Sequence, residues 1–134
     1  MKDKMIDVSI IIVNYNTCKI TDACIASVVD KTKGVSYEII LVDNASTDGS
    51  KEFFEHDERV IYIYSEINGG FGVGNNIGMK RAKGKYFFLL NSDTILINNA
   101  VKEFYDYAEA QGKLAVYGCW LVGRFHVLIS QRIL

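Results

Sequence analysis

The sequence has 134 residues, which is enough for one domain with a sizeable hydrophobic core. Hydrophobic residues make up 49% of it and charged residues 23%, as in an ordinary soluble globular protein. Fifteen basic and sixteen acidic residues leave a net charge of −1, so the overall charge gives no electrostatic case for a nucleic-acid or anionic-membrane partner. A local basic cluster at 80–85 fits the exposed end of a helix.

The three cysteines argue against a disulfide framework and against a zinc site. Cys18, Cys24 and Cys119 are odd in number and form no CxxC pair, which favours reduced thiols. No apolar run approaches the roughly 20 residues of a membrane-spanning helix, and the N-terminal residues lack the apolar core of a signal peptide. We therefore expect a cytoplasmic protein without a transmembrane segment, and peripheral association with the inner face of the membrane stays open.

The apolar pattern predicts strands and helices in alternation. Runs rich in β-branched and aromatic residues predict strands over 8–13, 37–42, 60–64 and 85–90. Apolar residues at helical spacing predict helices over 20–31, 73–83 and 100–110. A short helix is expected around Phe53 and Phe54, and the residues that could cap it are Ser46, Thr47 and Asp48.

The last part of the chain predicts a hairpin, with strands over 114–122 and 125–129 joined at Gly123-Arg124. Alternating strands and helices are typical of an α/β fold whose central sheet is mostly parallel and flanked by helices. The expectation is therefore a single Rossmann-like layered domain over residues 1–134 with a C-terminal hairpin.

Three polar loops are expected on one edge of the sheet. Parallel strands with right-handed crossovers place their carboxyl ends on the same edge, and α/β proteins bind ligands there. The residues that end or follow these strands are Asn14-Tyr15-Asn16, Asp43-Asn44 and Asn91-Ser92-Asp93.

The side chains of this edge suit a nucleotide and a metal ion. Tyr15 could stack on a planar base, Asp43 could accept hydrogen bonds from a base or a sugar, and Asp93 could hold a divalent cation. A structural role stays open for each of them: Tyr15 as a partly buried filler, Asp43 as a loop cap and Asp93 as the N-cap of the next helix.

The glycine-rich stretch at 68–74 does not match the common phosphate-binding motifs. A GxGxxG fingerprint would need glycine at position 75 or 77, which hold Asn75 and Ile77. A P-loop fails as well, because Met79 and Tyr86 occupy two of its required positions. The glycines then indicate close approach of the backbone to a ligand or to the sheet, and Asn75 and Asn76 could bond the loop or a ligand.

Three segments together resemble the family 2 inverting glycosyltransferases of the GT-A fold. They are 8–17 (VSIIIVNYNT), 38–50 (EIILVDNASTDGS) and 68–94 (NGGFGVGNNIGMKRAKGKYFFLLNSDT), in the family's order and spacing. The resemblance covers about residues 7–122. It implies a domain that binds a nucleoside-diphosphate sugar of the UDP, dTDP or GDP type.

The resemblance also implies a role for each residue of the edge. Tyr15 and its neighbours would line the nucleobase pocket, and Asp43 would bind the base or the ribose. The D-x-D-type motif falls on Asn91-Ser92-Asp93, with Asp93 as the ligand of Mg²⁺ or Mn²⁺ and Asn91 on the ribose side. This motif is similar to the LNxDT variant of rhamnosyltransferase-like members, which points to a deoxysugar or dTDP donor. The nucleotide-sugar-binding residues expected in this way are Asn14, Tyr15, Asn16, Asp43, Asn44, Asn76, Asn91 and Ser92.

Members of this family continue into an acceptor-binding half that supplies the catalytic Asp or Glu. The sequence has no acidic residue after Trp120, so we expect the domain to stop short of that half and the general base to lie beyond Leu134. His126 is the remaining candidate that titrates near neutral pH, and a strand histidine is more often structural.

Two further interpretations stay open. The chain could be a non-catalytic nucleotide-sugar-binding or assembly module, and it could form a homo-oligomer. An oxidoreductase or a signalling receiver is disfavoured, because the dinucleotide motif fails and no acid cluster ends the first strand. The acceptor could be a glycan, a lipid carrier or a protein, and no nucleic-acid partner is expected.

Overall fold

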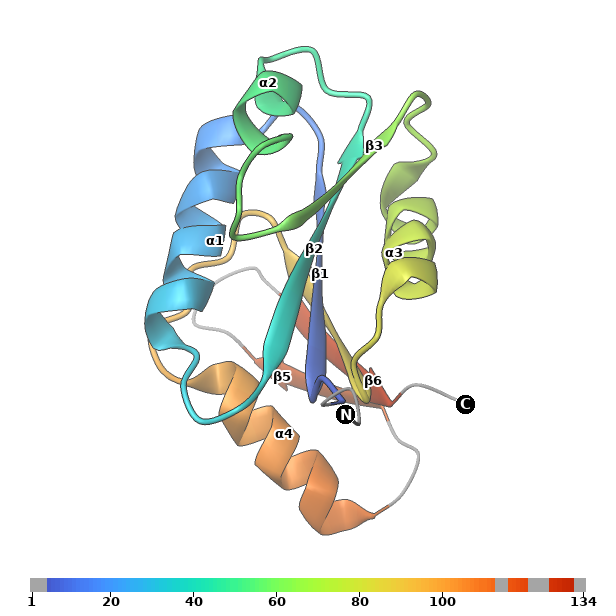
Figure 1. The fold of residues 1–134 in the computed structure, drawn as a ribbon. Coiled ribbons are helices and arrows are strands. Elements are labelled where there is room, and N and C mark those ends of the chain that lie inside the picture. Colours follow the sequence, from blue (N-terminus) through green and yellow to red (C-terminus); the bar gives the residue numbers. More distant parts are fainter. Residues whose placement is uncertain (1–4, 113–115, 121–125, 132–134) are drawn as a thin grey trace.

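A computed structural model describes residues 5–112, 116–120 and 126–131, the last two ranges as backbone strands. Six strands form one sheet in the order β3-β2-β1-β4-β6-β5 (Figure 1). Their bounds are β1 Val8–Asn14, β2 Tyr37–Asn44, β3 Ile61–Ser65, β4 Tyr86–Asn91, β5 Val116–Trp120 and β6 His126–Gln131. The first four pair in parallel, as the sequence predicts.

The helices cover both faces of the sheet. α1 (Cys18–Lys31), α2 (Ser50–Phe54) and α4 (Ala100–Gln111) lie on one face, and α3 (Gly70–Arg81) lies alone on the other (Figure 1). The face of α1 carries the larger apolar cluster, with Ile25 and Val28 of that helix against Ile12 and Leu41 of the strands. The sheet is therefore the middle layer of three, which explains why β1 is buried along its whole length.

The C-terminal strands extend the sheet on the side of β4. β6 pairs antiparallel with β4, and β5 pairs antiparallel with β6. The antiparallel pairing of β5 with β6 agrees with the predicted hairpin. The residues predicted to form its turn, Gly123 and Arg124, lie outside the described residues.

Helix α3 begins three residues earlier than the sequence predicts, at Gly70 rather than at 73. The glycine-rich stretch therefore forms the first turn of the helix instead of a loop before it. Two of its glycines lie directly on β1: a Cβ atom at Gly74 would come 2.8 Å from Cγ1 of Val13, and one at Gly78 would come 2.5 Å from Cγ2 of Ile11. These glycines allow close approach to the sheet, which is one of the two explanations that the sequence left open.

Of the residues predicted to cap α2, Asp48 bonds its first residue, although Gly49, with φ of +87°, occupies the N-cap position itself. Oδ1 of Asp48 accepts the N–H of Ser50 at 3.1 Å, and its Oδ2 accepts the N–H of Cys18 at the start of α1. Ser46 turns instead toward the loop after β1, where its Oγ accepts the backbone N–H of Asn16.

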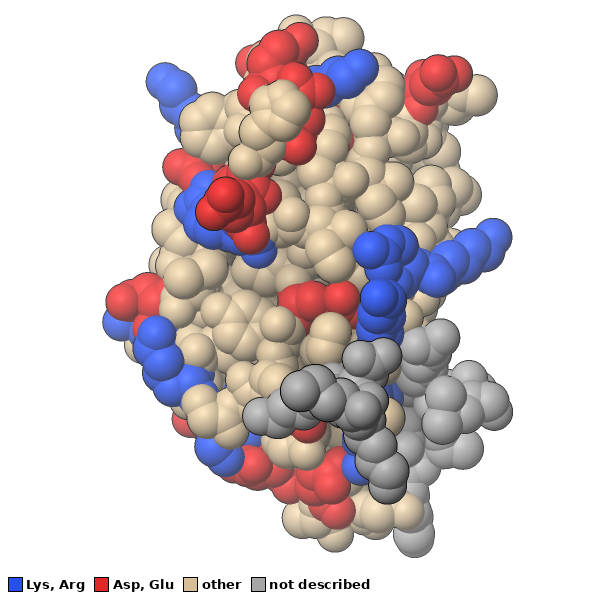
Figure 2. Space-filling model, in the orientation of Figure 1, with Lys and Arg blue, Asp and Glu red and all other residues tan. Residues whose placement is uncertain are grey.

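Charged side chains are unevenly spread over the surface. In Figure 2, Lys and Arg side chains gather over the C-terminal end of α3, and few charges lie over its N-terminal end. In the described ranges no helix is both long and apolar enough to cross a membrane.

Replacing Gly78 by alanine should destabilise the domain by roughly 1–3 kcal/mol, because the added methyl group overlaps the buried side chain of Ile11. Gly72→Ala is the matched control, since an added Cβ there meets nothing within 4 Å and removes the flexibility of a helical glycine. It should raise the free energy of unfolding by about 0.5–1 kcal/mol. Urea unfolding measures both values, and equal stability of the two variants would contradict the packing.

Candidate functional site

The register of the sheet brings the polar ends of three strands together. Asn14 at the end of β1 is paired with Asp43 of β2, and Val13 is paired with Asn91 of β4. The three loops that the sequence places on one edge therefore do lie side by side there. The structure divides their side chains into a buried set and an exposed set.

Asp43 is buried completely, and both of its carboxylate oxygens are occupied. Oδ1 accepts the backbone N–H of Ser46 at 3.0 Å, and Oδ2 accepts the hydroxyl of Tyr62 at 2.7 Å. Burial and the charge of Asp43 both raise the pKa of Tyr62 far above its ordinary value, which keeps that hydroxyl protonated as a donor. In this structure Asp43 is thus a loop cap, the structural role considered for it from the sequence.

Asn14 extends the same network into α1. Its Oδ1 accepts the hydroxyls of Thr17 and Thr21, at 2.9 and 2.8 Å, and its Nδ2 donates to Oγ of Ser46 at 3.1 Å. Asn14 is fully buried, so it faces the protein interior and not the solvent. The network fixes the loops after β1 and β2 against each other, because every polar atom of the Asn14 side chain has a partner.

Two loop residues next to this network have a left-handed backbone. Asn16 has φ of +52° and Ala45 has φ of +61°. Asparagine adopts this conformation readily, and alanine does so at a cost of about 1–2 kcal/mol. Oδ1 of Asn16 also accepts the N–H of Thr47 at 2.7 Å, which joins the two loops a second time. Backbone strain of this kind gathers at functional sites, and no pattern in the sequence predicts it at Ala45.

The exposed set consists of Tyr15, Asn16 and Asp93, and Asn91 and Ser92 are partly buried. Tyr15 is 51% exposed, so it is not the filler that the sequence left open, and its ring is accessible for stacking. Asp93 is exposed and forms no hydrogen bond or ion pair within the described ranges. It does not cap a helix either, because α4 begins only at Ala100 with Asn99 at its N-cap.

A residue of α1 bonds the last residue of β4. The thiol of Cys24 donates to the backbone oxygen of Asn91 at 3.6 Å. Burial, with a smaller effect from the charge of Asp93, raises the pKa of Cys24 to about 12, so the thiol stays neutral. The turn after Asn91 closes through the N–H of Thr94, which donates to the oxygen of Asn91 at 3.1 Å. This arrangement places Ser92 and Asp93 at the tip of the turn.

Of the asparagines near α3, two are buried and one is exposed. Nδ2 of Asn44 donates to the backbone oxygen of Gly70 at 3.0 Å and so ties the end of β2 to the start of α3. Oδ1 of Asn44 and Oδ1 of Asn75 are buried without a hydrogen-bond partner in the part of the chain that the structure describes. The structure does not bring Asn76 to this edge: it is exposed and lies about 200° around the helix axis from Gly74, which contacts the sheet.

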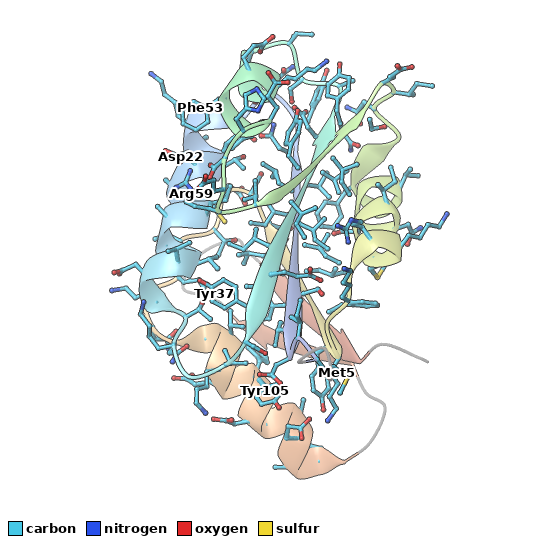
Figure 3. The ribbon with its side chains drawn as sticks, viewed as in Figure 1. Met5, Asp22, Tyr37, Phe53, Arg59 and Tyr105 are labelled. Carbon is cyan, nitrogen blue, oxygen red and sulfur yellow. The ribbon has the colours of Figure 1, made fainter. Side chains whose placement is uncertain are left out.

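An open depression of about 580 Å³ lies on the other side of the β1–α1 loop, and its lining includes Asn16, Asp48 and Phe53. Its rim is fixed by Arg59, whose guanidinium bonds Asp22 and Asp57 and lies beside Asp22 in Figure 3. The hydrogen bond from Arg59 lowers the pKa of Asp57. Arg59 pairs with both carboxylates, so neither Asp22 nor Asp57 is a free carboxylate.

A metal ion at the edge would have Asp93 as its protein carboxylate. Among residues 5–112 no group of three or more His, Cys, Asp or Glu side chains could hold a metal. An exposed carboxylate fits Mg²⁺ or Mn²⁺ when phosphate oxygens and water complete the coordination, which is the usual arrangement for Mg²⁺ with phosphorylated substrates. The side chain of His126, the other candidate from the sequence, lies outside the described part of the chain.

Solved structures of two other proteins share this fold. The mannosyltransferase PcManGT of Pyrobaculum calidifontis, in complex with GDP-Man and Mn²⁺, covers 93% of this chain and 44% of its own, with a TM-score of 0.74 and 16% identity. S. aureus TarS 1–349, in complex with UDP-GlcNAc, covers 80% of this chain and 32% of its own, with a TM-score of 0.68 and 24% identity. The domain therefore has the GT-A type of α/β fold, as the sequence predicts.

The sequence comparison identifies the family. The model of "Glycosyl transferase family 2" matches residues 9–129. The glycosyltransferase GlyG of Streptococcus pneumoniae serotype 4 is 33% identical over 115 residues, which are 83% of this chain and 38% of GlyG. The chain belongs to glycosyl transferase family 2, and it spans well under half the length of GlyG.

Replacing Tyr62 by phenylalanine should lower the free energy of unfolding by roughly 1.5–3 kcal/mol, because it removes a donor from the buried carboxylate of Asp43. Tyr64→Phe is the matched control on the same strand: its exposed ring, with the ammonium of Lys51 4.5 Å from the centroid, is kept. That change should stay within about 0.5 kcal/mol. Chemical denaturation compares the two, and a similar loss in both would show that Asp43 does not depend on Tyr62.

Proposed function

We propose that this chain is the donor-binding domain of a glycosyltransferase and binds a nucleoside-diphosphate sugar at the carboxyl edge of the sheet. The observation that carries the proposal is that the polar and aromatic side chains at this edge form a buried group and an exposed group. Buried polar groups fix the loops, and an exposed aromatic ring and an exposed, unpaired carboxylate stand free beside them. A binding site needs this combination, because its contact groups must be accessible while their supports are rigid.

Tyr15 is proposed to stack on the nucleobase, with Asn16 shaping the loop that carries it. Base–aromatic stacking contributes about 1–3 kcal/mol per base. Asp43, Asn14 and Asn44 support this pocket from within as the structure stands. Direct contact of Asp43 with the base or ribose would require its carboxylate to exchange the hydroxyl of Tyr62 or the N–H of Ser46 for the ligand.

Asp93 is proposed to hold a divalent cation together with the diphosphate, and Asn91 and Ser92 to bond the ribose side. Asn91 keeps hydrogen-bonding capacity without a second negative charge, so the motif supplies one carboxylate to the metal. When bound, such a cation offsets the negative charge that develops on the departing nucleoside diphosphate. The complexes of the two structural neighbours, with UDP-GlcNAc and with GDP-Man and Mn²⁺, support this assignment for the ligand class.

The reaction proposed for the whole enzyme is inverting transfer of the sugar to an acceptor hydroxyl. In such a displacement a carboxylate base takes the proton of the hydroxyl as its oxygen attacks the anomeric carbon. We assign this base to no residue of the present chain and propose that an acceptor-binding part of the enzyme supplies it. In that case the chain binds the donor without transferring the sugar, and a transfer assay with labelled nucleotide sugars tests this directly.

Mn²⁺ should strengthen the binding of at least one of UDP, dTDP and GDP, and Asp93→Ala should abolish that gain because the cation loses its protein ligand. Titration calorimetry with and without Mn²⁺ measures both. Asp106→Ala, which removes an exposed carboxylate on α4, is the control and should keep the gain. The site assignment fails if none of the nucleotides binds, or if the Asp93 variant keeps the full effect of Mn²⁺.

Tyr15→Ala should weaken nucleotide binding about 5- to 150-fold, which corresponds to a lost stacking energy of about 1–3 kcal/mol. Tyr107→Ala on α4 is the matched control, because its side chain is 52% exposed against 51% for Tyr15. Quenching of intrinsic fluorescence by the nucleotide, or calorimetry, gives the affinities. An unchanged affinity of the Tyr15 variant would place the base elsewhere.

A further inference from the structure

The exposed side of α3 and the residues that follow it are basic, and the acidic Glu66 precedes the segment at its other end. From Ile67 to Lys85 the sequence has four basic residues and no acidic one, although the whole chain has a net charge of −1. Lys85 pairs with Glu109 on α4. Lys80, Arg81 and Lys83 are exposed and enter no ion pair among the described residues. These three residues form the basic end of the surface, seen as the blue group over α3 in Figure 2.

One carboxylate lies close to the basic end. Oε1 of Glu38 accepts the backbone N–H of Lys83 at 2.7 Å and the hydroxyl of Ser9 at 2.6 Å. Glu38 is half-buried between these donors, so its charge is already bonded to them. Three basic side chains against one such carboxylate leave the local charge positive.

The opposite end of the same surface is apolar. Ile67, Phe71 and Val73 are 76%, 53% and 50% exposed, and they lie in the first turn of α3 and the loop before it. Val73 and Lys80 are seven residues apart, which is about 10 Å along a helix and close to two full turns, so they share one side of α3. Phe71 lies about 180° around the helix axis from Lys80. The surface thus has an apolar tip beside the carboxyl edge of the sheet and a basic end farther along the helix.

We propose that this surface docks the domain onto an anionic lipid bilayer. An amphipathic surface binds a membrane interface when its apolar side chains enter the boundary of the acyl chains and its basic side chains meet anionic headgroups. The long stems of lysine and arginine let their charges reach headgroups while the helix tilts. A soluble polyanion would use the basic end alone and leave the apolar tip in water, so the combination favours lipid.

The orientation follows from the positions of the two ends. Because the apolar tip lies at the start of α3, docking turns the carboxyl edge of the sheet toward the bilayer. The donor site would then open near the membrane surface, where an acceptor carried on a lipid could meet it. The docking itself does not depend on nucleotide binding.

The test is co-sedimentation of the 134-residue chain with vesicles of phosphatidylcholine alone or mixed with phosphatidylglycerol. The mixed vesicles should bind the chain, the neutral ones should not, and added salt should weaken the binding. Each basic side chain near an anionic surface contributes about a fivefold gain in partitioning. The triple change Lys80→Gln, Arg81→Gln and Lys83→Gln should therefore weaken binding about 100-fold.

Matched controls separate this surface from general effects of charge and apolar exposure. Lys19→Gln with Lys31→Gln and Lys33→Gln removes three exposed lysines from α1 and its end, and should leave binding within about twofold. Val73→Ser should weaken binding, and Ile20→Ser, at 51% exposure on α1 against 50% for Val73, should not. Circular dichroism confirms that each variant is folded.

Three outcomes would overturn the proposal. The first is no binding to the mixed vesicles, and the second is an equal loss in the α1 control. The third is binding that depends on the three basic residues but not on Val73, with soluble polyphosphate competing as well as lipid, which would identify a soluble polyanion as the partner.

Discussion

Helix α3 lies close to strand β1, because glycines at the contact add no side chain of their own to those of the strand. Alternate residues of the strand, Ile11 and Val13, face Gly78 and Gly74, and Gly84 continues the contact at Ser9 after the helix has ended. This close approach positions the start of α3 at the carboxyl edge, where Asn44 of β2 bonds the oxygen of Gly70. The carboxyl edge of the sheet and the exposed surface of α3 both take their positions from this contact.

At the carboxyl edge of the sheet, buried side chains fix the loops and exposed side chains stand at the tips of the loops. Asn14 and Asp43 are buried and bonded, and they fix two loops that come from different strands. Tyr15 and Asp93 stand exposed at the tips of the loops that are fixed in this way. Buried polar groups without partners would cost about 1–3 kcal/mol each, so the network must form as a unit. Its completeness makes the loops rigid enough to present accessible groups in a defined geometry.

The local charge of the α3 surface differs in sign from the net charge of the whole chain. A net charge of −1 suggests no preference for anionic partners, but the acidic residues lie outside the segment from Ile67 to Lys85. Electrostatic attraction at a surface acts over about one Debye length, near 8–10 Å in physiological salt, so the local sign decides it and not the sum over the chain. The exposed apolar residues beside the basic ones add a second attraction of a different physical kind.

The order of the elements, the parallel sheet and the edge at which the polar loops meet follow from the sequence alone. β-Branched runs and helical spacing are local patterns, and the topology of parallel strands follows from them. The sequence also places Asp93 at this edge, because it closely follows a buried strand, and the structure leaves it exposed there. That Asp43 and Asn14 face inward, that Asn76 faces away and that the glycines contact the sheet is visible in the tertiary structure alone. These outcomes depend on partners about 20 to 75 residues apart, and the pattern of neighbouring residues carries no information on such distances.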